Sequence, residues 1–239
     1  MNKVDILAIG VHPDDIELCA AGTLISHIDQ GGSVGIVDLT QGELGTRGTP
    51  ELRLSEADKA GKIMGVDFRE NAGFKDGFFK GDEEEKLEIV KFIRSGQPKI
   101  LITNAIRDRH PDHGRAAKLV YDAWFLSGLA SVKTYVDGEL QSRWRPDVIY
   151  HFIQDYIIEP DFVVDISDTF ERKMEAIKAF KSQFYDPDSK ELDSPLTNQD
   201  FFAQIEGRAR SLGRQIGVEF GEGYTSHRYV GVSSLLDLL

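Results

Sequence analysis

The sequence predicts an α/β protein with a Rossmann-like three-layer fold, in which a mostly parallel sheet is flanked by helices. Continuous apolar segments, typical of strands buried on both faces, alternate with segments of helical periodicity. Glycine-rich or polar turns separate the two kinds of segment. The 239 residues, 41% of them hydrophobic, are enough for one substantial core. No repeat or low-complexity linker divides the chain, so we expect a single domain over residues 1–239.

Strand and helix patterns alternate regularly through the first half of the chain. Apolar runs predict four strands, at Val4–Val11, Ser33–Thr40, Val66–Asn71 and Lys99–Asn104. Apolar residues three or four apart predict helices at Ile16–Gln30, closed by two glycines; at about Glu51–Gly65, entered through Pro50; at about Asp82–Ser95; and after RHPDHGRAA. Strands that alternate with helices in this way indicate a parallel sheet.

The pattern beyond Gly128 is less regular. We expect strands at Asp147–Phe152 and Phe162–Ile166, and helices at Thr169–Gln183 and Gln199–Ile216. The segment FYDPDSKELDSP has the composition of an exposed loop.

Charge and composition restrict the class of partner. The formal net charge of −12 argues against nucleic acid and anionic membranes, because both require clustered Lys and Arg. No segment approaches the roughly 20 apolar residues of a membrane span, and no signal peptide is evident. The single cysteine, Cys19, excludes a disulfide within the chain. We therefore expect a soluble cytoplasmic protein that acts on a small molecule.

Two acidic histidine motifs follow predicted strands. GVHPDDIE comes at the end of the first strand, and RHPDHGRAA follows the strand KILITN. Ligands of open α/β sheets bind at the carboxyl ends of the strands, so both motifs belong to one rim. Catalytic zinc takes three protein ligands, and His12, Asp15, His110 and His113 offer suitable donors at a spacing of three residues. Asp14 is a carboxylate beside these ligands that could act as a base.

The two motifs are also compatible with roles other than metal binding. Dinucleotide binding is disfavoured, because the first turn lacks G-x-G-x-x-G and its two carboxylates would repel phosphate. Asp14 or Asp15 could instead cap the helix from Ile16, and Asp112 could cap the following helix. Two histidines and a carboxylate also suit other metals, so Zn²⁺ is expected with Fe²⁺ or Co²⁺ as alternatives.

At these residues the chain resembles the PIG-L/LmbE-like family of zinc-dependent N-acetylglucosaminyl deacetylases. GVHPDDIE is similar to the family motif A-H-P-D-D-x-E, with Val11 in place of alanine, and HPDHGRAA is similar to H-x-D-H-x-x-A. The segments TQGELGTRGTPELRLSEADKAGKIMGV and KMEAIKAFKSQF extend the resemblance over essentially the whole chain. The first of them is especially similar to the branch that acts on N-acetylglucosaminyl-L-malate in bacillithiol biosynthesis.

The resemblance implies a role for each residue of the two motifs. The implied zinc ligands are His12, Asp15 and His113, and Asp14 would be the general base. His110 would stabilise the oxyanion or protonate the leaving amine, with Asp112 orienting it. The implied reaction is hydrolysis of an acetamide to acetate and a free amine.

The resemblance also implies substrate contacts. Arg53, Asp76 and Glu43 would hold sugar hydroxyls. A malyl aglycone would add two carboxylates, which arginine binds well, so Arg109 beside His110 is the first candidate, with Arg47 and Arg107 as weaker ones. A homo-oligomer, with a hexamer as one form, is implied as well.

Several residues outside the motifs have the sequence context of structural residues. We expect His27, His151 and Cys19 to be structural, and Tyr224 either to close over the pocket or to pack in the core; His227 is left open. The alternatives to the malyl substrate are deacetylation of chitobiose or N-acetylglucosamine, and a non-catalytic sugar- or metal-binding protein.

Overall fold

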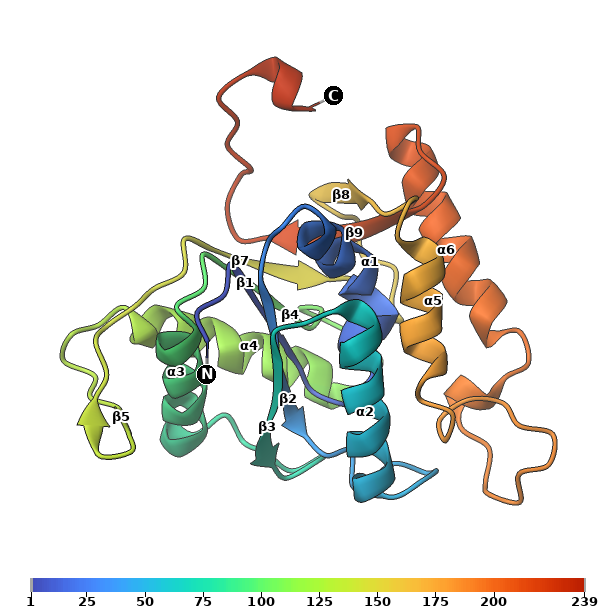
Figure 1. Cartoon of the computed structure of the whole chain (residues 1–239), viewed down its shortest axis with the longest axis horizontal. Helices are drawn as coiled ribbons and strands as arrows, with labels where there is room; N and C mark the ends of the chain where they lie inside the picture. The colour runs from blue at the N-terminus through green and yellow to red at the C-terminus, as the bar shows by residue number, and fades with distance from the viewer. Residues whose placement is uncertain (1, 239) are drawn as a thin grey trace.

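The computed structural model describes residues 2–238 of the chain. Within them, a seven-stranded sheet has the order β3-β2-β1-β4-β7-β9-β8 (Figure 1). Its strands are β1 (Ile6–Gly10), β2 (Val34–Thr40), β3 (Phe68–Phe74), β4 (Ile100–Thr103), β7 (Val148–Phe152), β8 (Phe162–Asp165) and β9 (Gly221–Ser226). The pairs from β3 to β7 are parallel, whereas β9 runs antiparallel to both of its neighbours. The predicted, mostly parallel sheet is confirmed.

Helices cover both faces of the sheet and make it the middle of three layers. The helices are α1 (Asp15–Asp29), α2 (Pro50–Met64), α3 (Glu83–Gly96), α4 (Pro111–Ser127), α5 (Phe170–Lys178) and α6 (Phe201–Ile216). α5 packs against α1 and α2, and α6 packs against β9, on one face of the sheet, while α3 and α4 pack together on the other (Figure 1). The predicted three-layer α/β fold is therefore confirmed.

The alternation along β1 explains why its sequence is continuously apolar. Ile6 and Ala8 belong to the core beneath α1 and α5, whereas Leu7 and Ile9 belong to the core beneath α3 and α4. Successive side chains of a strand point to opposite faces, so a strand covered on both sides must be apolar at every position.

The structure differs from the sequence-based expectation in three places. The helix expected to reach Gln183 ends at Lys178, and the chain then turns so that Phe180 and Phe184 are buried. A short hairpin, β5 (Tyr135–Val136) and β6 (Glu139–Leu140), was not predicted. β9 inserts between β7 and β8, a long-range pairing that its glycine-rich sequence does not reveal.

The order of the strands determines where on the sheet a ligand site is expected. β1 pairs with β2 on one side and with β4 on the other, so the order of connection reverses between β1 and β4. Ile9 is in register with Thr103, so both strands end at the same edge. This is the crevice in which open α/β sheets bind ligands. Among residues 2–238, none of the helices combines the length and apolarity needed to cross a bilayer.

Candidate metal centre and active site

The turn after β1 holds Asp14 in a strained conformation. Asp14 has φ 138° and ψ −23°, a region that L-residues rarely adopt. Its side chain makes no capping hydrogen bond to α1 and instead accepts one from Arg53 Nη2 at 3.0 Å. The interpretation of Asp14 as a side-chain cap is therefore wrong. Strain of this kind persists where surrounding contacts enforce it, most often at functional sites.

Asp15 is equally occupied by contacts other than capping. Its Oδ2 accepts hydrogen bonds from the backbone N–H of Val11 and of His12, each at 3.1 Å, and from Asn104 Nδ2 at 2.8 Å. Gln154 Nε2 donates to Oδ1 at 3.0 Å. The carboxylate thus ties the end of β1 to the ends of β4 and β7, which holds it rigidly below the cavity.

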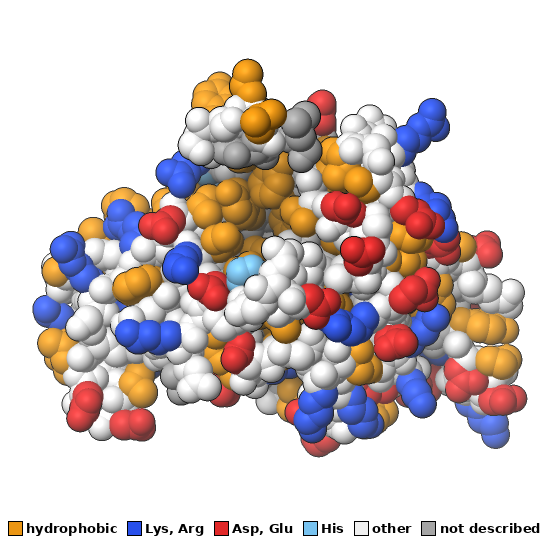
Figure 2. Space-filling view, turned by 45° about the horizontal axis from the view of Figure 1, so that its top comes forward, with side chains coloured by type: hydrophobic (Ala, Val, Ile, Leu, Met, Phe, Trp, Pro, Cys, Tyr) orange, Lys and Arg blue, Asp and Glu red, His pale blue; other side chains and the backbone are white. Residues whose placement is uncertain are grey.

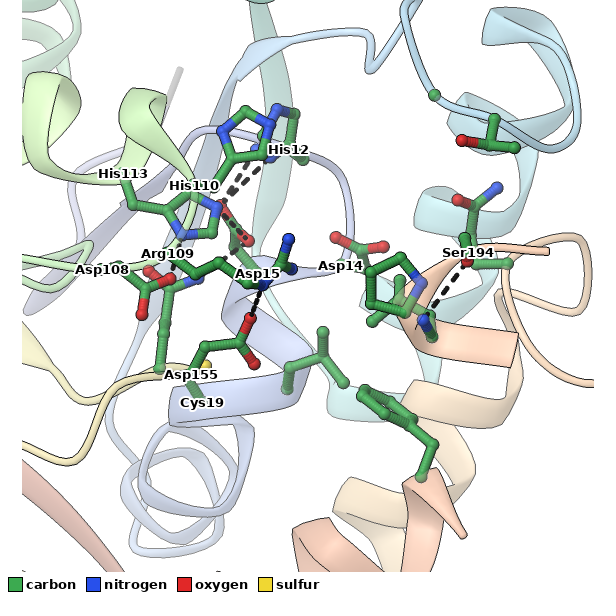
Figure 3. Close-up of a pocket in the computed structure, with 18 of the residues that line it drawn as sticks. His12, Asp14, Asp15, Cys19, Asp108, Arg109, His110, His113, Asp155 and Ser194 are labelled. Atoms are coloured by element: carbon green, nitrogen blue, oxygen red, sulfur yellow. Dashed lines mark hydrogen bonds and ion pairs between the residues drawn. The ribbon is translucent and has the colours of Figure 1, made fainter. Parts of the chain in front are cut away.

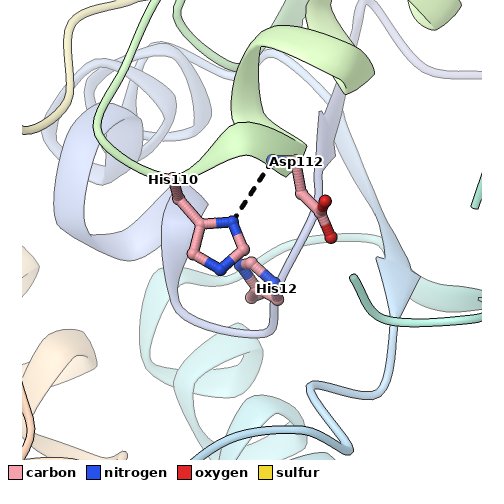
Figure 4. Close-up of side chains that lie close together, drawn as sticks. All are labelled: His12, His110 and Asp112. Carbon is pink, nitrogen blue, oxygen red and sulfur yellow. Dashed lines mark hydrogen bonds between the residues drawn. The ribbon is translucent and has the colours of Figure 1, made fainter. Parts of the chain in front are cut away.

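The second motif begins α4 with a histidine cap. His110 occupies the N-cap position, and its Nδ1 accepts a hydrogen bond from the Asp112 backbone N–H at 3.3 Å (Figure 4). The Asp112 carboxylate is fully buried and accepts from Gly77 N at 2.7 Å and from Arg115 Nη1 at 2.5 Å. The interpretation of Asp112 as the cap of this helix is wrong. Its contact with His110 runs through its backbone.

Three of the predicted ligands converge on one point (Figure 3). One donor atom each from His12, Asp15 and His113 lies within 4.8 Å of the others. His113 Nε2 is 3.4 Å from Asp15 Oδ1, and His12 Nδ1 is 3.8 Å from Asp15 Oδ2. Donors of a tetrahedral zinc ion with bonds of about 2.0–2.1 Å stand roughly 3.3 Å apart. The donor set fits a divalent metal ion with a further position open to the cavity.

A second cluster, of His12, His110 and Asp112, also meets the distance criterion. It is the poorer metal site, because the Asp112 carboxylate is already paired with the cationic Arg115 and Nδ1 of His110 already accepts a hydrogen bond from Asp112 N.

Two carboxylates orient the imidazoles of the better site. Asp108 Oδ2 lies 2.6 Å from His113 Nδ1, and Asp76 Oδ1 lies 3.0 Å from His12 Nε2. Each carboxylate accepts a hydrogen bond from one ring nitrogen, so the opposite nitrogen of each ring is the one that would lose its proton and bind a metal. Histidines that bind metals commonly have such partners.

The electrostatics of the centre favour a cation. Burial opposes a charged His113, yet Asp15 and Asp108 raise the pKa of His113 to about 10. Burial likewise opposes an ionised Asp15, but His113 and His12 outweigh it and lower the pKa of Asp15. Burial raises the pKa of Asp14 to about 6, against the opposing charge of Arg53. The site therefore stabilises positive charge and keeps a carboxylate of increased basicity beside it.

The three residues predicted to bind the sugar differ in how closely they contact the residues of the candidate metal centre. Arg53, 5% exposed, donates to Asp14, to Pro13 O at 3.0 Å and to Gly42 O at 3.3 Å. Asp76 bonds His12 and also accepts from Leu44 N at 3.1 Å. Both line the cavity, whereas Glu43 reaches only Asp76 N, at 2.7 Å. Contacts from these three residues to sugar hydroxyls stay a prediction.

The predicted carboxylate-binding arginines differ in availability. Arg109 lines the cavity but pairs with Asp155, Nε to Oδ2, at 2.6 Å. Arg47 is buried and donates to backbone carbonyls of Phe184 and Leu192. Arg107 lies over the Tyr156 ring. A role in substrate binding stays a prediction for each.

Four other residues have the structural surroundings expected of them. Tyr224 is buried and stacks on Phe162, so it packs in the core and does not close over the cavity. Cys19 is buried on α1. His151 is buried and bonds His227, and His27 Nε2 lies 3.7 Å from Asp5 Oδ2.

The cavity above the centre has a volume of about 360 Å³. Sequence reasoning missed most of its far wall, which comprises Leu18 and Cys19 of α1, the segment Ser194–Pro195–Leu196, and Phe201, Gln204, Ile205 and Arg208 of α6. It also missed Asp108, Asn104 and Gln154. Asp108, two residues before His110, could have been found by its spacing, whereas nothing marks Gln154 or α6.

Comparison with known proteins identifies the family. The family profile described as GlcNAc-PI de-N-acetylase (PIG-L) matches residues 7–124. The chain is 31% identical to diacetylchitobiose deacetylase of Thermococcus kodakarensis, over 75% of this chain and 70% of that protein. It is 25% identical to a probable N-acetyl-α-D-glucosaminyl L-malate deacetylase 2 of Bacillus anthracis, over 77% and 83% of the two chains.

A solved structure shares the fold over nearly the whole chain. The conserved protein TT1542 of Thermus thermophilus superimposes with a TM-score of 0.86 at 31% identity, covering 97% of this chain and 98% of that one. The chain therefore belongs to the PIG-L family of GlcNAc-PI de-N-acetylases, enzymes that hydrolyse amides.

Proposed function

We propose that this protein is a zinc-dependent N-deacetylase that releases acetate from an N-acetylglucosaminyl small molecule, with N-acetylglucosaminyl-L-malate as substrate in bacillithiol biosynthesis. The observation that carries the proposal is the arrangement of Asp14. Its carboxylate is buried, bonded to Arg53 and held by a strained backbone next to the ligand Asp15. A site that merely bound a metal or a sugar would not need such a carboxylate.

The chain's own residues suit acetamide hydrolysis. A divalent ion held by His12, Asp15 and His113 would polarise the acetyl carbonyl and lower the pKa of water. Asp14 accepts the proton of the attacking water, for which a carboxylate with a pKa raised to about 6 is well matched near neutral pH. This proton is passed to the leaving nitrogen as the C–N bond breaks, which yields acetate and the free amine. The hydrogen bond from Arg53 fixes the orientation of that carboxylate.

We propose that His110 stabilises the oxyanion that forms during the reaction. Burial lowers the pKa of His110, and the adjacent His12 and His113 lower it further, so the neutral ring is favoured. Nδ1 accepts from the Asp112 backbone N–H, so Nε2 carries the proton. This N–H is available to a developing oxyanion, a contact worth about 3–4 kcal/mol in comparable sites.

Asp14→Asn tests the proposal. Asparagine has the same shape and tolerates a positive φ, so folding and metal content should be kept. We expect turnover to fall by about 10²–10⁴-fold, the usual contribution of a general base. Acetate release and zinc content are measured on the same preparation. Unchanged turnover in a metal-replete variant would contradict the role of Asp14.

The substrate and the metal are tested separately. The Bacillus anthracis relative supports the malyl glycoside, whereas the more similar Thermococcus relative supports diacetylchitobiose. Acetate release from the two compounds and from N-acetylglucosamine ranks them by kcat/KM. Chelation followed by reconstitution with Zn²⁺, Fe²⁺ or Co²⁺ identifies the metal, and activity without any metal would refute the proposed mechanism.

We also propose that the protein forms a homo-oligomer, with a hexamer as the first form to test. The segment after β9 leads away from the body of the molecule (Figure 1), and hydrophobic side chains gather on the face beneath it (Figure 2). Tyr229 is 99% exposed and Leu235 82% exposed. Light scattering on the full chain and on a chain lacking residues 229–239 tests this, and a monomeric full chain would refute it. A cytoplasmic location stays a prediction.

A further inference from the structure

The cavity extends well beyond the metal centre. Figure 3 shows Ser194 across the cavity from His12 and His113, with Asp14 between them. α6 forms much of the far wall, because Phe201, Ile205 and Arg208 lie four and then three residues apart and so share one face of the helix. An acetamide positioned at the metal centre would leave the remainder of a glycoside facing this wall.

The charges that line the cavity are paired, with one exception. Asp14 pairs with Arg53, Asp108 with His113, Asp76 with His12 and Asp155 with Arg109. Arg47 is held by backbone carbonyls and by Asp193. Within residues 2–238, Arg208 is the charged side chain of the lining that has neither a hydrogen bond nor an ion pair.

The surroundings of Arg208 suit the binding of a ligand anion. Leu18, Leu196 and Ile205 are partly buried and line the same wall, whereas Arg208 is exposed and therefore accessible to a ligand in the cavity. Gln204, one turn earlier on α6, adds a neutral donor and acceptor. Arg208 and Cys19 of α1 line the same cavity, and the positive charge of Arg208 opposes the rise that burial causes in the pKa of the Cys19 thiol.

A local positive charge in the cavity would also offset the repulsion between an anionic substrate and the negatively charged chain. With a formal net charge of −12, the protein repels an anionic substrate at long range. An unpaired guanidinium at the far wall supplies local positive potential, and its planar fork can bind a carboxylate through two hydrogen bonds.

We propose that α6 forms the aglycone-binding wall and that Arg208 binds a carboxylate of the aglycone, so that this residue selects anionic over neutral glycosides. The proposal rests on the deacetylase function proposed above and deepens it. It also reassigns the carboxylate contact from Arg109, which is already paired with Asp155, to Arg208.

The test compares Arg208→Gln with the wild type on an anionic and a neutral substrate. We expect kcat/KM for N-acetylglucosaminyl-L-malate to fall by roughly 10- to 100-fold, mainly through KM, as for the loss of a charge-assisted hydrogen bond. For the neutral substrate N,N'-diacetylchitobiose, kcat/KM should stay within about twofold of the wild type, because this compound has no carboxylate for Arg208 to bind. A loss for both substrates would instead indicate damage to the metal centre. Arg208→Lys should recover part of the loss.

The matched control is Arg210→Gln on the same helix. Arg210 pairs with Glu206 and Glu219 and lies over the Phe220 ring, away from the cavity lining. This variant should leave both substrates unaffected. An equal loss for both substrates in Arg208→Gln would mean that α6 acts structurally, and an unchanged preference for the anionic substrate would also overturn the proposal. A selective loss in Arg109→Gln instead would assign the carboxylate to Arg109.

Calorimetric binding of N-acetylglucosaminyl-L-malate separates this inference from the proposed function. If the wild type binds the compound without releasing acetate, the deacetylase assignment fails while Arg208→Gln should still weaken binding at least tenfold. If the wild type binds and turns over the compound but Arg208→Gln binds it equally well, the deacetylase assignment stands and the role of Arg208 fails. If the wild type neither binds nor turns it over, both fail.

Discussion

The contact between the buried His151 and the exposed His227 should make folding stability depend on pH. His151 is 1% exposed, and its Nδ1 lies 2.8 Å from the carbonyl oxygen of Asn104, so Nδ1 must carry a proton and donate it. Its Nε2 is then an acceptor for His227 Nε2 at 2.9 Å. Protonation of His151 would set two N–H groups against each other inside the protein.

The size and sign of the effect follow from the pKa. In the unfolded chain the pKa of His151 is 6.5. In the folded protein burial, and to a smaller extent the charge of His227, lowers this pKa to about 4, although the hydrogen bond to the Asn104 carbonyl opposes the change. Above pH 6.5 the ring is neutral in both states and its contribution to stability is complete. Between pH 6.5 and about 4 only the unfolded chain binds the proton, so the free energy of unfolding falls by up to about 3 kcal/mol.

The assay is urea unfolding at several pH values from 4.5 to 7.5, followed by circular dichroism in the presence of a chelator. The chelator removes the separate pH dependence of metal binding. His151→Gln should lower stability at pH 7.5 yet lose most of the decline that the wild type shows below pH 6.5. His27→Gln, on the partly exposed face of α1, is the control and should keep the wild-type slope. Identical slopes in the wild type and His151→Gln would refute the reasoning.

Three further changes have definite expected outcomes. Asp108→Asn should weaken metal affinity by about 10–100-fold through loss of its contact with His113, measured by competition with a chromophoric chelator; unchanged affinity would contradict an orienting role. Gly22→Ala should destabilise the fold by about 1–3 kcal/mol, because the new methyl group would lie 2.8 Å from Ile166, whereas Gly207→Ala, with open space around it, should be neutral or stabilising in thermal unfolding. An equal melting temperature for both glycine variants would argue against this packing. Arg47→Ala should accelerate limited proteolysis within residues 185–193, since Arg47 donates to the carbonyls of Phe184 and Leu192; an unaltered cleavage rate would show that other contacts hold this segment.

Much of the fold and the centre of the site could be predicted from local patterns. β1 reads as a buried strand because side chains on both of its faces enter a core. The turns HPDD and HPDH place donors three residues apart, and a tight turn at the end of a parallel strand leaves little freedom in where they point. The sequence alone therefore determined the α/β class, the rim on which the motifs lie and the set of candidate donors, from which the family resemblance selected His12, Asp15 and His113.

The remainder depends on residues that are distant in the chain. Arg53 reaches Asp14 from α2, Gln154 reaches Asp15 from the end of β7, and Arg208 enters the cavity from α6. A local pattern states which face of an element is buried, but it does not state which neighbour the tip of a long polar side chain will contact. The order of the strands and the packing of the helices make that choice, so only the tertiary structure could decide which arginine bonds Asp14 and which is left unpaired.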